Sequence, residues 1–214
     1  MKYPTDWNFL DGIHNLTIQG AEDGQSEIVV EPRYANVINF LNCSNISISN
    51  IKAGHTEGSV CSGGVFLFHN CVGIQIDNTH MYGCGTRGLS LYKTADVTVT
   101  GSTIYECTSG MMNIQSATNI MFQDCVFRDN ITAVSNSMIN AMYVSGLTFD
   151  ACSFLRNTNG EVMFTLTGCE NIVVSNTEFF DNEVREFSDQ GDLEVDASSR
   201  FEDNKFDTTL WYML

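Results

Sequence analysis

Four charged side chains fall in or beside predicted turns and have the chemistry of an active site. They are His55, Glu57, Arg87 and Glu106. In an enzyme, Glu57 or Glu106 would act as acid or base, because a carboxyl group can exchange a proton with a substrate. Arg87 would stabilise negative charge, and His55 would carry a proton. The competing interpretation is that these are ordinary solvated side chains, since the turns of any repeat protein collect such residues.

A second candidate feature is a pair of tyrosines, Tyr82 and Tyr105, which lie 23 residues apart. Aromatic rings at neighbouring positions can form an apolar platform for a sugar ring. The alternative is that the two rings only stack on each other.

A repeat along the chain determines where these residues lie. Seven segments share an apolar strand, then Asn, Asp or Gly followed by Ile-x-Ile or its equivalent. The first apolar anchors of these segments are Leu16, Ile46, Ile74, Val97, Ile120, Leu147 and Ile172. Their spacings are 30, 28, 23, 23, 27 and 25 residues. Such a period predicts a stacked solenoid whose interior is filled by packing, so that function lies on its outside.

The strands within each repeat are short and alternate apolar with polar residues, which indicates β-structure. Three short strands per turn of 23–30 residues predict an all-β fold, a single-stranded parallel β-helix of about seven to eight rungs. One predicted inward column contains Phe68, Leu91, Ile114, Ala141 and Leu166; a second contains Ile76, Val99, Phe122, Phe149 and Val174; a third contains Met81, Ile104, Phe127, Phe154 and Phe179. A leucine-rich horseshoe is disfavoured because its repeat motif is missing.

The repeated rungs, such as NIMFQDCVFRDN at 119–130, resemble those of right-handed parallel β-helix proteins of the pectin-lyase-like superfamily. The resemblance covers about residues 9–182 and implies the fold more than an activity, since lyases, hydrolases, phage tail proteins and adhesins share this coil. We expect the β-helix over residues 1–182, interrupted by a long irregular excursion at residues 20–36. Residues 183–214 are expected to form an acidic C-terminal cap or a degenerate last rung of the same domain.

In enzymes of this family, substrate generally lies along the outer face of one sheet. Two predicted outward columns in this chain run through Asn39, Leu67, Ser90, Asn113, Asn140 and Thr165, and through Leu41, His69, Tyr92, Gln115, Met142 and Thr167. These twelve positions contain no charged Asp, Glu, Lys or Arg, which argues against catalytic carboxylates there. The candidate substrate-binding residues are His69, Tyr92, Asn113, Gln115 and Asn140, with Tyr82 and Tyr105. A merely solvated sheet face is the alternative.

Eight cysteines fall mostly in shared columns: Cys43, Cys71 and Cys169 in one, Cys84 and Cys107 in another, Cys125 and Cys152 in a third, with Cys61 apart. This pattern predicts stacked, buried free thiols rather than a disulfide framework or a zinc site. Asn130, Asn157 and Asn182 continue the Cys84 column and predict a ladder of side-chain amides.

The net charge of −16 argues against nucleic-acid binding and against an anionic membrane surface. The acidity suggests solubility, or else Ca²⁺ binding; no other cofactor or metal is expected. No apolar stretch is long enough for a membrane span, and no signal peptide is visible. If the chain is a fragment of a longer protein, we expect an extracellular or cell-surface location.

Three functions remain open from the sequence. The first is a non-catalytic β-helix module of a larger protein that binds a carbohydrate or protein partner on its flank. The second is a polysaccharide lyase or glycoside hydrolase that acts on an acidic polysaccharide. The third is a segment of a trimeric tail fibre, although the sequence leaves the oligomeric state open.

Overall fold

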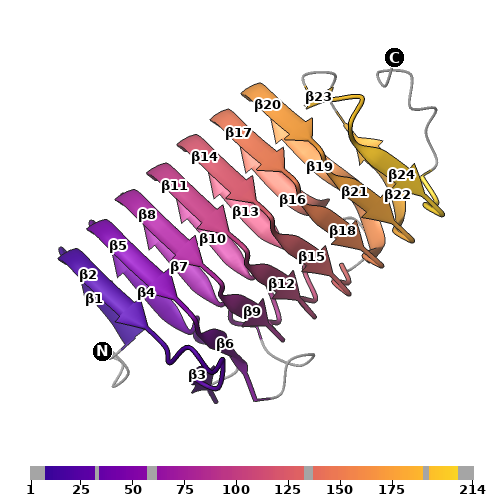
Figure 1. The fold of residues 1–214 in the computed structure, drawn as a ribbon. Coiled ribbons are helices and arrows are strands. Elements are labelled where there is room, and N and C mark those ends of the chain that lie inside the picture. Colours follow the sequence, from indigo (N-terminus) through magenta and orange to yellow (C-terminus); the bar gives the residue numbers. More distant parts are fainter. Residues whose placement is uncertain (1–7, 32–33, 57–61, 133–136, 190–192, 207–214) are drawn as a thin grey trace.

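The computed structural model of the chain describes residues 8–31, 34–56, 62–132, 137–189 and 193–206. These residues wind into a coil of three parallel β-sheets, here called sheets A, B and C, each with eight strands. Three consecutive strands form one rung, with one strand in each sheet (Figure 1). The expected parallel β-helix of seven to eight rungs is therefore confirmed.

The strands follow the chain in strict rotation through the three sheets. Sheet A contains β1 (Phe9–Asp11), β4 (Ile38–Leu41), β7 (Phe66–His69), β10 (Leu89–Tyr92), β13 (Met112–Gln115), β16 (Ser137–Met142), β19 (Thr158–Thr167) and β22 (Glu183–Ser188). Sheet B contains β2 (His14–Gln19), β5 (Ser44–Ser49), β8 (Val72–Asp77), β11 (Ala95–Thr100), β14 (Thr118–Gln123), β17 (Ser145–Asp150), β20 (Glu170–Ser175) and β23 (Leu193–Val195). Sheet C contains β3 (Glu27–Val30), β6 (Lys52–His55), β9 (His80–Tyr82), β12 (Thr103–Tyr105), β15 (Val126–Arg128), β18 (Ser153–Leu155), β21 (Glu178–Phe180) and β24 (Arg200–Glu202).

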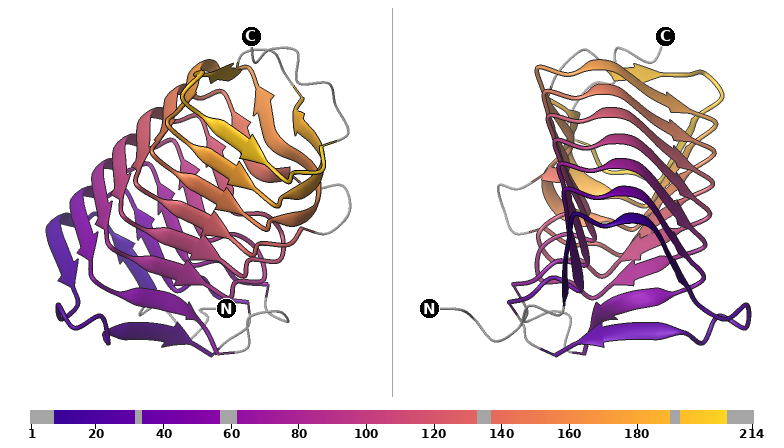
Figure 2. Two further views of the ribbon diagram at one scale, coloured as in Figure 1. Left: turned by 45° about the vertical axis from the view of Figure 1, so that its right-hand side comes forward. Right: turned by 90° about the vertical axis from the view of Figure 1, so that its left-hand side faces the viewer.

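The three sheets enclose one core that runs the length of the coil (Figure 2). The apolar anchors of sheet B stand over one another, with Ile74 paired to Val97 and Val97 to Ile120. The three predicted inward columns have the expected register in sheets A, B and C. Because side chains alternate between the two faces of a strand, this register also fixes which residues face solvent.

Aromatic side chains fill the C-terminal half of the core. Phe154 stacks on Phe127 and on Phe179 with ring centroids 4.7 Å apart in both pairs. Phe122 and Phe149 stack in the same way at 5.0 Å. These centroid separations are typical of stacked aromatic pairs, so successive rungs are held by side-chain packing as well as by backbone hydrogen bonds.

The predicted amide ladder is present beside this core. Asn130 Nδ2 donates to Asn157 Oδ1 at 3.0 Å, Asn157 Nδ2 donates to Asn182 Oδ1 at 2.9 Å, and the ladder continues to Asn204. Asn130, Asn157 and Asn182 are fully buried. Since buried amides must be hydrogen-bonded, the ladder fixes the stacking register of these rungs.

The seven described cysteines are buried free thiols, as predicted. Cys61 lies outside the described residues. Burial raises the pKa of the Cys71 thiol to about 11, so that it stays protonated at neutral pH. Cys43 and Cys71 lie one rung apart, and the Cys43 backbone N–H donates to Cys71 Sγ at 3.4 Å.

Residues with a left-handed backbone conformation recur at the same position in successive rungs. The second residue of the strands β2, β5, β8, β11, β14, β17 and β20 has a positive φ angle, and these residues are Asn15, Asn45, Gly73, Asp96, Asn119, Gly146 and Asn171. We call this set the amide column. Asn and Asp adopt this conformation more readily than other side chains, and Gly adopts it without steric cost. The frequent Asn before Ile-x-Ile in the sequence therefore reflects a backbone requirement.

Two regions lie at the ends of the repeat. Residues 20–36 were expected to be irregular, yet β3 lies among them and pairs with β6. In the expected cap or last rung, β22, β23 and β24 extend the three sheets by pairing with β19, β20 and β21. None of the described segments forms a helix of the length and apolarity needed to cross a membrane.

Candidate functional site

The outer face of sheet A presents the predicted polar residues in the predicted columns. Asn113 lies beside Asn140, and Gln115 lies beside both Tyr92 and Met142. His69 precedes Tyr92 in the same column. Their side chains are half-buried, so this face is accessible without being deeply hollowed.

Hydrogen bonds already join several of these side chains to one another. Asn113 Nδ2 donates to the Tyr92 hydroxyl at 2.5 Å, and Asn140 Nδ2 donates to Asn113 Oδ1 at 2.9 Å. A ligand on this face would compete with these internal bonds, so part of each new hydrogen bond would be offset by the loss of an old one.

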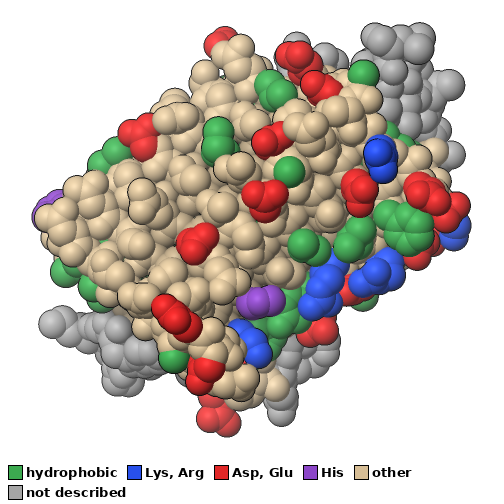
Figure 3. Space-filling view, viewed as in Figure 1, with side chains coloured by type: hydrophobic (Ala, Val, Ile, Leu, Met, Phe, Trp, Pro, Cys, Tyr) green, Lys and Arg blue, Asp and Glu red, His purple; other side chains and the backbone are tan. Residues whose placement is uncertain are grey.

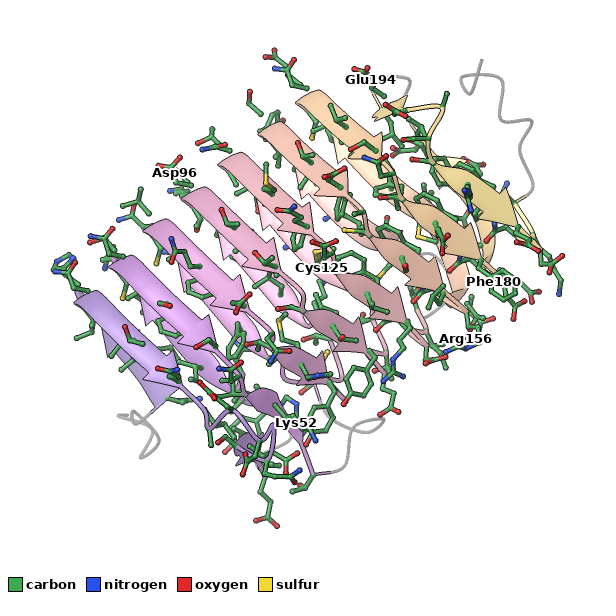
Figure 4. All side chains as sticks on the ribbon, viewed as in Figure 1. Lys52, Asp96, Cys125, Arg156, Phe180 and Glu194 are labelled. Carbon is green, nitrogen blue, oxygen red and sulfur yellow. The ribbon has the colours of Figure 1, made fainter. Side chains whose placement is uncertain are left out.

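The outer face of sheet C carries a different surface. The last residues of β9, β12, β15, β18 and β21 form an outward column on this face, each paired to the next in register. They are Tyr82, Tyr105, Arg128, Leu155 and Phe180. We call these five residues the tyrosine stripe. In Figure 3 apolar and basic side chains gather along the lower right edge of the molecule, and Figure 4 places Lys52, Arg156 and Phe180 along that edge.

The two tyrosine rings of the stripe are nearly parallel but offset. Their planes differ by 19° and their centroids are 5.5 Å apart. Parallel rings touch at about 3.5 Å between planes, so a 5.5 Å separation requires the rings to slide past one another. The buried phenylalanine pairs are closer. The offset means that neither tyrosine ring fully covers the other, and both side chains are half-buried, so part of each is accessible to solvent.

Neighbouring residues hold the Tyr82 ring in place. A Cβ atom at Gly54 would lie 2.6 Å from two atoms of this ring, so only glycine leaves room for it. The Tyr82 hydroxyl donates to Glu27 Oε1 at 2.5 Å, two rungs away. The space left by Gly54 and the Glu27 carboxylate therefore both position the hydroxyl end of the ring.

Burial raises the pKa of the Tyr82 hydroxyl, and the hydrogen bond to Glu27 and the charge of that carboxylate raise it further. Burial also raises the pKa of Tyr105, against the nearby Arg128 charge, which lowers it. Both phenols thus stay protonated at physiological pH and can donate as well as accept hydrogen bonds.

Cations flank the stripe. The Arg128 guanidinium carbon lies 4.2 Å from the centroid of the Tyr105 ring, within the range of a cation–π contact. Arg128 Nη1 also donates to Asp129 Oδ2, and Arg156 Nε donates to Asp129 Oδ1, each at 2.7 Å. The Arg156 bond is the main cause of the lowered pKa of Asp129. This network fixes the plane of Arg128 over the ring.

His80 lies beside the stripe with its ring edge-on to Tyr105 at 6.2 Å. Burial lowers its pKa, as do the charges of Lys52 and Arg128, so the ring is neutral at physiological pH. Carboxylates, including Glu27 and Glu106, lie on the same flank, so its charge is mixed rather than basic.

Three of the four residues proposed for catalysis lie in the described part of the chain. His55 is 4 % exposed, and its Nε2 lies 2.9 Å from the carbonyl oxygen of Ala35. Glu106 is exposed and lies in the register of Gly83, which puts it two rungs, about 10 Å, from His55. Arg87 is half-buried before β10, and Glu57 lies outside the described residues. The catalytic assignment stays a prediction.

No group of three or more His, Cys, Asp or Glu side chains with metal-binding geometry occurs in the described ranges.

The sequence identified Tyr82 and Tyr105 but missed the residues that position them. Arg128 follows Tyr105 by the same 23 residues that separate the two tyrosines. The spacing of the repeat therefore could have predicted that Arg128 lies next to Tyr105 on the neighbouring rung. The roles of Gly54 and Glu27 depend on contacts across rungs that no local pattern shows.

The comparisons with known proteins agree with this geometry. A family model described as the right-handed beta helix region matches residues 63–209, more than half of the chain. The chain belongs to the right-handed β-helix family. No curated protein sequence matches it.

Three solved β-helix structures are similar to the chain. The Streptococcus pneumoniae surface protein and adhesin PfbA is 16 % identical with a TM-score of 0.57, over 77 % of this chain and 48 % of that one. The ORF18 protein of Geobacillus virus E2 is 10 % identical with a TM-score of 0.53, over 92 % and 50 %. A putative glycosyl hydrolase from Parabacteroides merdae is 11 % identical with a TM-score of 0.50, over 74 % and 82 %.

At these identities the likeness shows the fold alone. The chain also spans only about half the length of the adhesin and of the viral protein. The family and the similar structures therefore establish the β-helix fold, and the role of this chain has to be argued from its own residues.

Proposed function

We propose that this chain is a non-catalytic β-helix module that binds a carbohydrate along the tyrosine stripe. The observation that carries the proposal is the offset stack of Tyr82 and Tyr105, two half-buried rings on the outer face of sheet C. The C–H face of a sugar ring is apolar and packs on an aromatic face, while its hydroxyl groups need polar partners at the rim. Arg128 and the two phenols supply those partners.

The regular spacing of the rungs favours a chain-like ligand over a single small molecule. Tyr82, Tyr105, Arg128, Leu155 and Phe180 repeat at the strand separation of about 4.8 Å, along a straight line. An oligosaccharide that lies parallel to the coil axis would contact several rungs at once, so that the free energies of several weak contacts would add.

A glycan array with the purified chain tests the proposal. We expect binding to at least one glycan class, and about fivefold weaker binding by Tyr105→Ala, since one aromatic contact contributes about 1 kcal/mol. Tyr143→Asn is the matched control. It removes a tyrosine that is 62 % exposed, away from the stripe, at a positive-φ position that suits asparagine. No binding by the wild type, or equal binding by Tyr105→Ala, contradicts the proposal.

A protein partner on the same flank is the alternative occupant, which a pull-down with wild type and Tyr105→Ala would reveal. The similarity to a surface adhesin supports an extracellular or cell-surface location if the chain is part of a longer protein.

The alternative function is a polysaccharide lyase or glycoside hydrolase that uses His55, Glu57, Arg87 and Glu106. One observation favours it: His55 Nδ1 and Arg87 Nε are buried and have no hydrogen-bond partner among the described residues, as happens at sites that await a ligand. Lyase activity would give new ultraviolet absorbance from acidic polysaccharides, with or without Ca²⁺, and hydrolysis would release reducing sugars. The absence of activity in both assays contradicts the enzymatic alternative.

A further inference from the structure

The outer face of sheet B contains a groove that the tyrosine stripe does not explain. Its volume is about 370 Å³, and it spans four rungs from β5 to β14, the front strands of Figure 1. Polar side chains line it, together with Met121, which is 42 % exposed. Its polar lining consists of Asn45, Ser47, Gln75, Asp96, Thr98 and Asn119. We call it the Gly73 groove, after the glycine at its centre.

The groove exists because Gly73 interrupts the amide column. On its N-terminal side Asn45 Nδ2 donates to Asn15 Oδ1 at 3.0 Å, and on its C-terminal side Asn119 Nδ2 donates to Asp96 Oδ1 at 2.7 Å. In both pairs the donor points to the preceding rung. An asparagine in place of Gly73 would extend the first pair by one rung, because its Nδ2 could donate to Asn45 Oδ1 as Asn45 Nδ2 donates to Asn15. Glycine leaves a gap between Asn45 and Asp96 instead.

The chemistry at the two ends of the gap is the same. A Cβ atom at Gly73 would lie 2.9 Å from Asn45 Oδ1, so this acceptor oxygen points into the gap. The opposite end is the Asp96 carboxylate, which has only acceptor oxygens; its side chain projects outward from the start of β11 (Figure 4). In the described part of the chain neither Asn45 Oδ1 nor Asp96 Oδ2 receives a hydrogen bond. Whatever fills the gap must therefore bring donors to both ends.

A sugar unit fits these requirements. Its hydroxyl groups can donate to Asn45 Oδ1 and Asp96, whose Cα atoms lie two rungs, about 10 Å, apart. Gln75 and Thr98 on the groove wall can both donate and accept, and exposed Met121 offers an apolar contact for a C–H face. We propose that the Gly73 groove is a second carbohydrate-binding site, which takes a neutral, hydroxyl-rich sugar unit and is independent of the tyrosine stripe.

The amide column itself supplies the test and its control. Gly73→Asn would fill the gap with the residue that four other members of the column carry at the same backbone conformation. The contact with Asn45 Oδ1 involves a side-chain end that can shift, so the variant should fold, with a thermal midpoint no lower than that of the wild type. Gly146→Asn makes the same change at φ +76°, outside the groove lining.

Saturation-transfer NMR with malto-, cello- and xylo-oligosaccharides as neutral probes, followed by titration, measures binding. We expect at least one probe to bind the wild type, Gly146→Asn and Tyr105→Ala, and Gly73→Asn to bind it at least tenfold more weakly. No binding of any neutral probe to the wild type at millimolar concentration overturns the proposal, as does equal binding by Gly73→Asn. Binding confined to amine-bearing chitosan oligomers also overturns it, because the groove would then recognise a cation. Loss of all binding in Tyr105→Ala alone would refute this groove and leave the tyrosine stripe standing.

Discussion

Replacing Asn157 with leucine should lower the free energy of unfolding by about 4 kcal/mol. Asn157 Oδ1 accepts hydrogen bonds from the Asn130 backbone N–H at 3.2 Å and from Asn130 Nδ2 at 3.0 Å. Leucine has a similar volume but no polar atoms, so the Asn130 backbone N–H loses its acceptor and Asn130 Nδ2 keeps only the Ile104 carbonyl. The Phe127 carbonyl also loses the Asn157 Nδ2 donor. Each such group costs about 1–3 kcal/mol. Asn182 Oδ1 keeps one donor, the backbone N–H of residue 157, at 3.1 Å.

Equilibrium unfolding in urea, followed by circular dichroism, measures this loss as a shift of the midpoint at unchanged slope. Asn70→Gly is the control. It removes a hydrogen bond of the same type, from Asn70 Nδ2 to Asn42 Oδ1 at 2.7 Å, but on the surface. We expect it to cost about 1 kcal/mol or less, because water replaces the lost partner. If Asn157→Leu costs no more than Asn70→Gly, the buried ladder does not fix the stacking of the rungs.

Three further predictions follow from individual contacts. Gly54→Ala should displace the Tyr82 ring, which costs about 1–3 kcal/mol and changes the near-ultraviolet dichroism of the tyrosines; an unchanged spectrum would contradict the packing. Because the folded pKa of His80 is lowered from 6.5, its contribution to stability is present above that pH and is lost as the pH falls through the folded pKa. His80→Gln should therefore flatten the fall of the urea midpoint between about pH 7.5 and pH 5.5, and an equally steep fall would refute it. Ellman's reagent should titrate at most one of the eight thiols in the native protein, since seven are buried, and all eight in urea; rapid reaction of several thiols would contradict their burial.

The sequence was sufficient to place most of the coil because every rung repeats the same anchor. The pairing of Ile74 with Val97 follows from their equal place in the repeat. β3 was missed because Glu27–Val30 follows a long insertion and carries no Asn-Ile-x-Ile anchor. In the same way, the burial of His55 depends on Ala35 and Gly63, which belong to irregular segments with no counterpart in other rungs.

The candidate sites were only partly predictable, for a related reason. Tyr82 and Tyr105 were found because both are aromatic and one repeat apart, whereas their offset depends on the bare backbone of Gly54. The Gly73 groove results from one missing side chain in a column of amides. Its signal, a glycine where neighbouring rungs have Asn or Asp, is visible in the sequence only once the register of the column is known.

Titration calorimetry with the strongest ligand from the glycan array, on wild type and on the Tyr82→Ala/Tyr105→Ala variant, tests the central claim most directly. If the tyrosine stripe is the binding surface, the double variant should lose at least tenfold in affinity, while Tyr143→Asn binds like the wild type. Equal affinity of the double variant and the wild type would show that the carbohydrate lies elsewhere on the coil.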